Sequence, residues 1–140
     1  MDELTELRER IENQDYQAAL EIVDELEEMS KEDKLNKIHS YLVILMLHLI
    51  KQAAENRTTK SWDRSILNST SRINRVNKRR KAGGYYADAL TLKALIAEAY
   101  PEALREASYE AFEGACTPEE IETKIDPKEI HALAAMRIEN

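Results

Sequence analysis

The sequence predicts an all-α protein, an antiparallel helical bundle of four main helices with a short N-terminal helix and short C-terminal helices. Helix-forming residues dominate the composition, apolar residues recur at spacings of three and four, and the chain has only three glycines and three prolines. No segment shows the strict apolar–polar alternation that is typical of a strand. A chain of 140 residues can bury a substantial core, so we expect a single helical domain over residues 1–140.

The N-terminal segment predicts two helices. Leu4, Leu7 and Ile11 form the apolar stripe of a short first helix. Asp15 is placed to cap the second helix, whose apolar side chains repeat on one face as far as Met29. The opposite face of this helix is acidic and carries Glu21, Asp24, Glu25 and Glu28.

A third helix is predicted from Ser30, because residues 30–33 have a hydroxyl at the cap position and a carboxylate three residues later, as in a capping box. Residues 41–51 form a nearly unbroken apolar run, which indicates a helix that is buried on most sides. The run has about ten residues, whereas a membrane-spanning helix needs roughly 20. We therefore expect the most buried helix of a bundle and no contact with a membrane. Its two apolar stripes contain Leu35, Ile38, Leu42, Leu45 and Leu49, and Val43, Met46 and Ile50.

The fourth helix is predicted to begin at Ser61 as its cap and to carry Trp62 in its first turn. It ends in the basic residues 78–81, where cations suit the negative end of the helix dipole. A fifth helix is expected from about residue 86 to 113, interrupted by Pro101, which either kinks the helix or restarts it.

Two start signals in the C-terminal tail predict two short helices. Thr117 and Asp126 are each followed by a proline, which suits the first helical position, and then by a glutamate within three residues. The second of these helices has Ile130, Leu133, Ala134 and Ile138 as its apolar residues.

Charge is distributed unevenly along the chain, which has a net charge of −7. Residues 1–33 contain thirteen Asp and Glu against three Lys and Arg, a net charge of −10, and residues 57–81 contain nine Lys and Arg against one Asp, a net charge of +8. These segments are expected to attract each other or oppositely charged partners. The single cysteine and the acidic start, which is unlike a secretory signal, predict a cytoplasmic protein.

The first candidate site is a polar cluster of Glu25, His48, Lys51, Trp62 and Arg64. His48 is either a proton-transfer or ligand-binding group in a cleft, or a histidine at the edge of a buried helix that is bonded to a carboxylate of the second helix. Trp62 either covers a pocket or stacks a base, or is a core anchor. We favour the structural interpretation of both residues, and we expect Arg64 to pair with the acidic second helix.

The second candidate site is the basic stretch, which could follow the phosphates of a nucleic acid. No aromatic residue is interleaved with its cations, so we favour a solvated basic end that pairs with the acidic helices, within the molecule or across a dimer. The candidate nucleic-acid-binding residues are Arg72, Arg75, Lys78, Arg79, Arg80 and Lys81.

No motif predicts a metal, a cofactor or catalysis. Helical di-metal sites use Glu three residues before His, but the residues at that spacing before the three histidines are Asn36, Leu45 and Lys128. The sequence has no paired cysteines and no glycine-rich phosphate loop, and Cys116 is expected to be an inert thiol.

Several segments, in this order, resemble a bacterial family with many cyanobacterial members. They are the Glu-rich helix that ends at Met29, Leu47-His48-Leu49-Ile50-Lys51, the segment from Arg57 through Ser61-Trp62 to Ile66, the segment from Ala97 to Ala103, the segment from Cys116 to Glu120, and Asp126-Pro127. The family is called domain of unknown function twenty-nine, and the similarity spans roughly residues 5–130. One departure is Gln52, where the family usually has an aromatic residue. The resemblance implies an all-helical domain and no particular activity.

Three functions follow from these patterns. The leading hypothesis is a non-enzymatic protein-interaction module that binds a protein partner or forms a homodimer. The first alternative is a nucleic-acid-associated regulator that uses residues 57–81. The second alternative is a small-molecule binder or enzyme with a polar pocket around His48.

Overall fold

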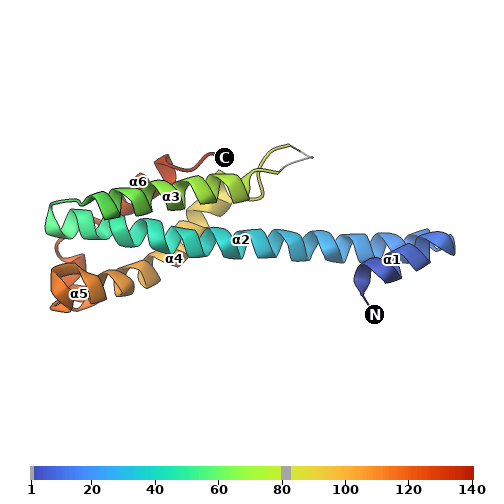
Figure 1. The fold of residues 1–140 in the computed structure, drawn as a ribbon, viewed down its shortest axis with the longest axis horizontal. Helices are drawn as coiled ribbons and strands as arrows, with labels where there is room; N and C mark the ends of the chain where they lie inside the picture. Colours follow the sequence, from blue (N-terminus) through green and yellow to red (C-terminus); the bar gives the residue numbers. More distant parts are fainter. Residues whose placement is uncertain (1, 80–82) are drawn as a thin grey trace. The chain divides into compact units, whose positions relative to one another are not determined.

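The structure, a computed structural model, describes residues 2–79 and 83–140. All regular elements in these residues are helical, so the predicted all-α class is confirmed. The chain divides into two compact units, Met1–Lys34 (unit 1) and Leu35–Asn140 (unit 2). The elements labelled in Figure 1 are α1 (Glu3–Glu12), α2 (Tyr16–Glu55), α3 (Lys60–Asn77), α4 (Ala89–Glu110), the short 3₁₀ helix η1 (Ala111–Gly114), α5 (Pro118–Glu122) and α6 (Pro127–Met136).

The predicted break between the second and third helices is wrong, because α2 runs through Ser30 as one helix of 40 residues. The residues around Ser30 include no glycine or proline, and the following Lys31 and Glu32 are good helix formers. A capping box stabilises a helix start where the chain arrives in an extended conformation. It does not interrupt a helix whose backbone can continue.

Unit 1 is a helical hairpin made by α1 and the first part of α2 (Figure 1). Asp2 caps α1 by accepting a hydrogen bond from the backbone N–H of Leu4 at 3.1 Å. The turn places Gln14 in the left-handed region with a φ of 61°. Asp15 then accepts a hydrogen bond from the N–H of Ala18, so the cap predicted at Asp15 is confirmed.

The core of unit 2 is built around the second half of α2, as the apolar run predicts. Five of its side chains have no exposed surface, and burying such a side chain contributes about 1.5–3 kcal/mol. Within unit 2, α3 lies beside α2, while α4 packs against α5 and α6 (Figure 1). The five side chains are Ile38, Leu42, Leu45, Met46 and Ile50.

The helix α3 begins one residue before the predicted cap. Thr59 is the cap, and its Oγ1 accepts a hydrogen bond from the backbone N–H of Trp62 at 3.1 Å. Ser61 is therefore already helical, and the prediction that it caps the helix is wrong. Trp62 stays in the first turn, as expected.

The same helix ends at Asn77, so the prediction that it continues into the basic residues is wrong. The side chain of Asn77 is fully buried and exchanges two hydrogen bonds with the backbone of Ala87, at 2.7 and 3.1 Å. It also donates to the carbonyl of Glu139 at 3.3 Å. These bonds hold the end of α3 against the following loop and the tail. Lys78 and Arg79 follow the helix, and the predicted residues Arg80 and Lys81 lie outside the described residues.

The helix α4 starts three residues later than predicted, because Asp88 caps it by accepting a hydrogen bond from the N–H of Thr91 at 2.8 Å. Pro101 lies inside this helix, which continues through it. Both short tail helices are confirmed. Thr117 forms a complete capping box at the start of α5, and Asp126 caps α6.

Candidate functional sites

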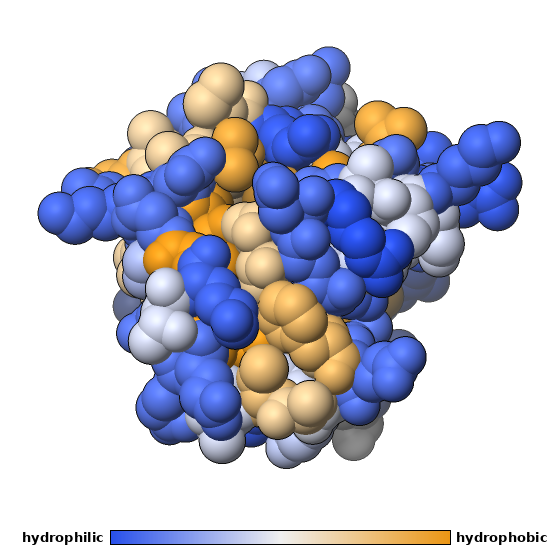
Figure 2. Space-filling view, turned by 90° about the vertical axis from the view of Figure 1, so that its left-hand side faces the viewer, coloured by the Kyte–Doolittle hydropathy of each residue, from blue (hydrophilic) through white to orange (hydrophobic). Residues whose placement is uncertain are grey.

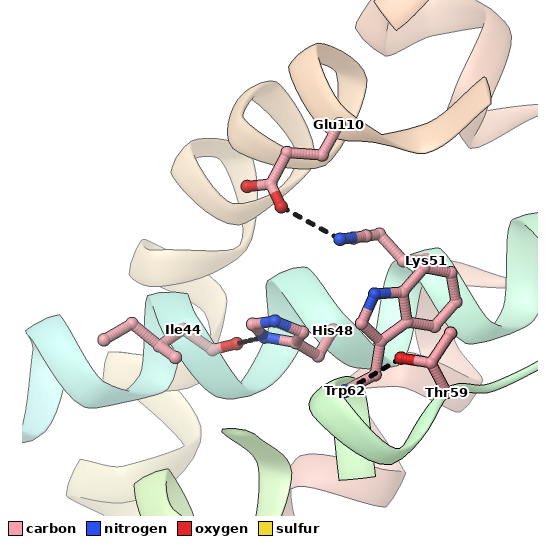
Figure 3. A network of polar contacts seen from close by, with 6 residues as sticks. All are labelled: Ile44, His48, Lys51, Thr59, Trp62 and Glu110. Atoms are coloured by element: carbon pink, nitrogen blue, oxygen red, sulfur yellow. Dashed lines mark hydrogen bonds and ion pairs between the residues drawn. The ribbon is translucent and has the colours of Figure 1, made fainter. Parts of the chain in front are cut away.

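A buried lysine is the centre of the polar cluster in unit 2 (Figure 3). The side chain of Lys51 on α2 is only 7% exposed, and its Nζ lies 2.9 Å from Oε1 of Glu110 at the end of α4. The same nitrogen lies 4.5 Å from the ring centroid of Trp62. A buried ammonium is costly unless it is paired, and here a carboxylate and an aromatic face share that role.

Trp62 is a buried anchor at the start of α3, as the structural interpretation predicts. It is 9% exposed, and a second cation, the guanidinium of Arg57, lies 4.7 Å from the centroid of its ring. Gln52 and Thr58 both bond to Asp63 in the same region, which ties the end of α2 to the first turn of α3. The aromatic ring therefore fixes the connection between the two helices.

His48 is half-buried one turn before Gln52 on α2. Its Nδ1 lies 2.8 Å from the carbonyl oxygen of Ile44, one turn earlier in the same helix (Figure 3). A carbonyl only accepts, so Nδ1 is the donor and carries the proton. The expected carboxylate partner from the second helix is thus wrong, because the backbone of α2 supplies the partner.

The structure brings together only part of the predicted polar cluster. Lys51 and Trp62 are in contact, but Glu25 is an exposed residue of unit 1. Arg64 is exposed and lines a shallow hollow of 300 Å³ with Lys60 and Ser61 on the first turns of α3. Figure 2 shows this end of unit 2, where hydrophilic side chains surround a band of apolar surface. The residue that sequence reasoning missed is Glu110, which is 59 positions away from Lys51.

A polar hollow of 340 Å³ lies between α2 and α3, and we call it the arginine hollow. Two of the predicted nucleic-acid-binding residues, Arg72 and Arg75, line it. The guanidinium of Arg72 lies 5.9 Å from the ring centroid of Tyr41 on α2, while that of Arg79 lies 5.7 Å from the ring of Tyr86. The lining residues are Tyr41, Asn68, Ser71, Arg72, Arg75 and Val76.

An apolar pocket of 370 Å³ opens between α4 and α6. His131 lines it, and its ring stands edge-on to the ring of Tyr100 at 4.8 Å between centroids. The hydroxyl of Tyr100 donates to the carboxylate of Glu122 at 2.8 Å. Burial, and then this carboxylate, raises the pKa of Tyr100 well above its usual value.

Unit 1 leaves most of its large apolar side chains in contact with solvent. Between residues 2 and 34, Ala19 alone is buried. Five large apolar side chains of this unit are at least half exposed: Leu4, Ile11, Tyr16, Leu20 and Met29.

Two further kinds of feature are absent from the described residues. No three His, Cys, Asp or Glu side chains among them are arranged to hold a metal ion. Of the helices that the structure describes, none is long and apolar enough to cross a bilayer.

Comparison with known proteins gives a family. The family model described as Domain of unknown function DUF29 matches residues 3–130. The protein belongs to this family. The match to the DUF29 model includes the hairpin of unit 1, the cluster at Lys51 and the whole arginine hollow. The curated proteins and the solved structures gave no match.

Proposed function

We propose that this DUF29 protein is a non-enzymatic protein-interaction module. Its acidic hairpin, unit 1, binds a basic amphipathic helix of a partner protein. The observation that carries the proposal is the apolar surface that the hairpin leaves open. Five large exposed apolar side chains within one small unit of two helices are more than a free surface needs and suit an interaction site.

In unit 1, the apolar face of α2 is wider than the part of it that the hairpin buries. At 3.6 residues per turn, the arc from Met29 to Leu20 covers about half of the helix circumference. Its middle residues are buried or half-buried, while Leu20 is 62% exposed and Met29 is 55% exposed at the two edges. The edges therefore remain available to a further helix. The middle residues are Ala19, Ile22, Val23 and Leu26.

Charge complementarity argues for a basic partner. Residues 1–33 carry a net charge of −10, with thirteen acidic side chains against three basic ones. A cationic helix would be steered toward this surface, and its apolar face would cover one of the two exposed edges, which lie on opposite sides of α2. Helix-in-groove recognition combines these two contributions.

The polar cluster supports a binding role rather than catalysis. Lys51 is engaged by Glu110 and Trp62, and Nδ1 of His48 is engaged by its own helix. A general acid or base requires an oriented partner and a path to a substrate. The contacts of Lys51 instead tie α2 to α3 and α4, and the contact of His48 stays within α2.

The experiment uses the full chain with the double variant Leu20→Ser/Met29→Ser. Partners are captured in the source cell by a photo-crosslinker at position 20, purified and titrated by calorimetry. We expect a purified partner to bind the unaltered protein and to bind the double variant at least about tenfold more weakly, a loss of about 1.4 kcal/mol. Rising salt should also weaken the binding, because the surfaces carry opposite charges.

The control is Leu90→Ser on α4, which removes a side chain that is 77% exposed in unit 2. It should leave the affinity unchanged. The proposal fails if every captured protein binds the double variant and the control equally well, or if none binds after purification. If the unaltered protein forms a homodimer and the double variant dissociates it, the proposal that a separate basic protein binds unit 1 is wrong.

A further inference from the structure

We propose that the arginine hollow is a binding site for the phosphoryl group of a small molecule. This site is independent of the partner surface on unit 1. All six lining residues belong to unit 2, with one on α2 and five on α3.

The spacing along α3 gathers the polar groups on one face. Asn68, Ser71, Arg72 and Arg75 are three or four residues apart, so their side chains stand next to one another on the helix surface. Tyr41 forms the facing wall from α2. The α3 side of the hollow thus follows directly from helical geometry.

The lining is rich in hydrogen-bond donors. Its two guanidiniums have five N–H groups each, and Asn68, Ser71 and Tyr41 add an amide and two hydroxyls. None of the six lining residues is acidic. Donors without neighbouring carboxylates suit a ligand that carries several anionic oxygens.

Within the part of the chain that the structure describes, no carboxylate neutralises the two arginines. Among the ion pairs in residues 2–79 and 83–140, none involves Arg72 or Arg75. Two like charges three residues apart on a helix repel each other, and an anion between them removes that repulsion. The ring of Tyr41 lies 5.9 Å from the guanidinium of Arg72 and helps to hold it over the hollow.

The chemistry favours a phosphoryl group over a simple halide or a single carboxylate. A guanidinium presents a planar fork that matches two oxygens of a phosphate, and two such forks can share one phosphoryl group. The volume of 340 Å³ falls in the range of small-molecule sites, about 300–1,000 Å³. Tyr41 and Val76 offer apolar contact to the rest of such a molecule.

The small number of cations in the hollow argues against a nucleic-acid backbone as its ligand. Neutralising a backbone needs a row of cations, and binding strength rises with the number of phosphates contacted. The hollow gathers two arginines, and the whole chain has a net charge of −7. A compact anion with few charges fits both observations.

The test measures the binding of phenyl phosphate to the full chain by NMR titration, with phenol as the uncharged comparison. We expect shifts at residues 68–76 with phenyl phosphate and none with phenol. The variant Arg72→Gln/Arg75→Gln should bind phenyl phosphate more weakly, by at least about tenfold for each guanidinium that is lost. Each factor of ten corresponds to about 1.4 kcal/mol of binding free energy. Arg72→Lys/Arg75→Lys should give an intermediate affinity, because it keeps the charge and loses the fork.

The matched control is Arg105→Gln, which removes one exposed cation from α4. It should leave the affinity for phenyl phosphate unchanged. Far-UV circular dichroism checks that all variants remain folded. The proposal is overturned if the glutamine variant binds phenyl phosphate as well as the unaltered protein does. It is also overturned if a single-stranded oligonucleotide binds the hollow and phenyl phosphate cannot displace it.

Discussion

The pair of Lys51 and Glu110 predicts an asymmetric response to mutation. The side chain of Lys51 is 7% exposed, whereas the side chain of Glu110 is 46% exposed. Glu110→Gln leaves the buried ammonium without its counter-charge. Removing one partner of a buried pair costs about 3–5 kcal/mol, but water can reach the outer side of this pair. We therefore expect Glu110→Gln to lower the free energy of unfolding by about 1–2 kcal/mol.

The reverse change should cost much less. Lys51→Met removes the charge that is buried and leaves a carboxylate that water can solvate. The methionine keeps the length of the stem and places its sulfur near the ring of Trp62, which is a favourable contact. Since replacing buried ions by apolar groups is often neutral, we expect the free energy of unfolding to change by about 0.5 kcal/mol or less.

The assay is urea unfolding followed by the fluorescence of Trp62, the only tryptophan in the chain. Glu98→Gln, an exposed carboxylate on the same helix as Glu110, is the matched control and should have no measurable effect. A loss for Lys51→Met that equals or exceeds the loss for Glu110→Gln would refute the reasoning. The stability of the pair would then come from the attraction itself and not from the cost of leaving an ammonium unpaired.

Three further predictions concern stability in unit 2. Asn77→Ala removes three hydrogen bonds and leaves the buried N–H of Ala87 without its partner, so chemical unfolding should show a loss of about 2–3 kcal/mol. Gly114→Ala places a side chain at a φ of 79°, and its Cβ would lie 3.1 Å from a backbone oxygen, so thermal unfolding should show a loss of about 1–2 kcal/mol. The raised pKa of Tyr100 means that the unfolded chain releases this proton first as the pH rises above about 10, so stability should fall there. Tyr100→Phe should remove this part of the alkaline loss, and an unchanged pH profile would contradict the assignment.

Local rules predicted the features that depend on neighbours in the sequence. The spacing of Leu42, Leu45 and Leu49 is enough to predict a buried helix face, since the helical period alone decides which residues share it. The caps at Thr117 and Asp126 follow from the residue types at adjacent positions. These predictions needed no knowledge of the partner elements.

Tertiary contacts decided what local rules could not. The break predicted at Ser30 is a different case, because it failed where helix-forming residues on both sides let α2 continue. The carboxylate that pairs with Lys51 lies on α4, far away in the sequence, and no spacing rule connects the two. The hollow at Arg72 needs Tyr41 from another helix, although the face of α3 that lines it was visible as a row of cations.

The charge asymmetry gives a final test that treats both proposals together. The acidic residues 1–33 and the basic residues 57–81 suggested that the segments pair with each other. If the two sites are independent, Leu20→Ser/Met29→Ser should leave the binding of phenyl phosphate unchanged. Arg72→Gln/Arg75→Gln should likewise leave the binding of the partner protein unchanged. Energies of distant, independent sites add, so the combined variant should show both losses and no more. If either pair of changes weakened both kinds of binding in calorimetry, the two charged segments would be acting on each other, and the proposed independence would be wrong.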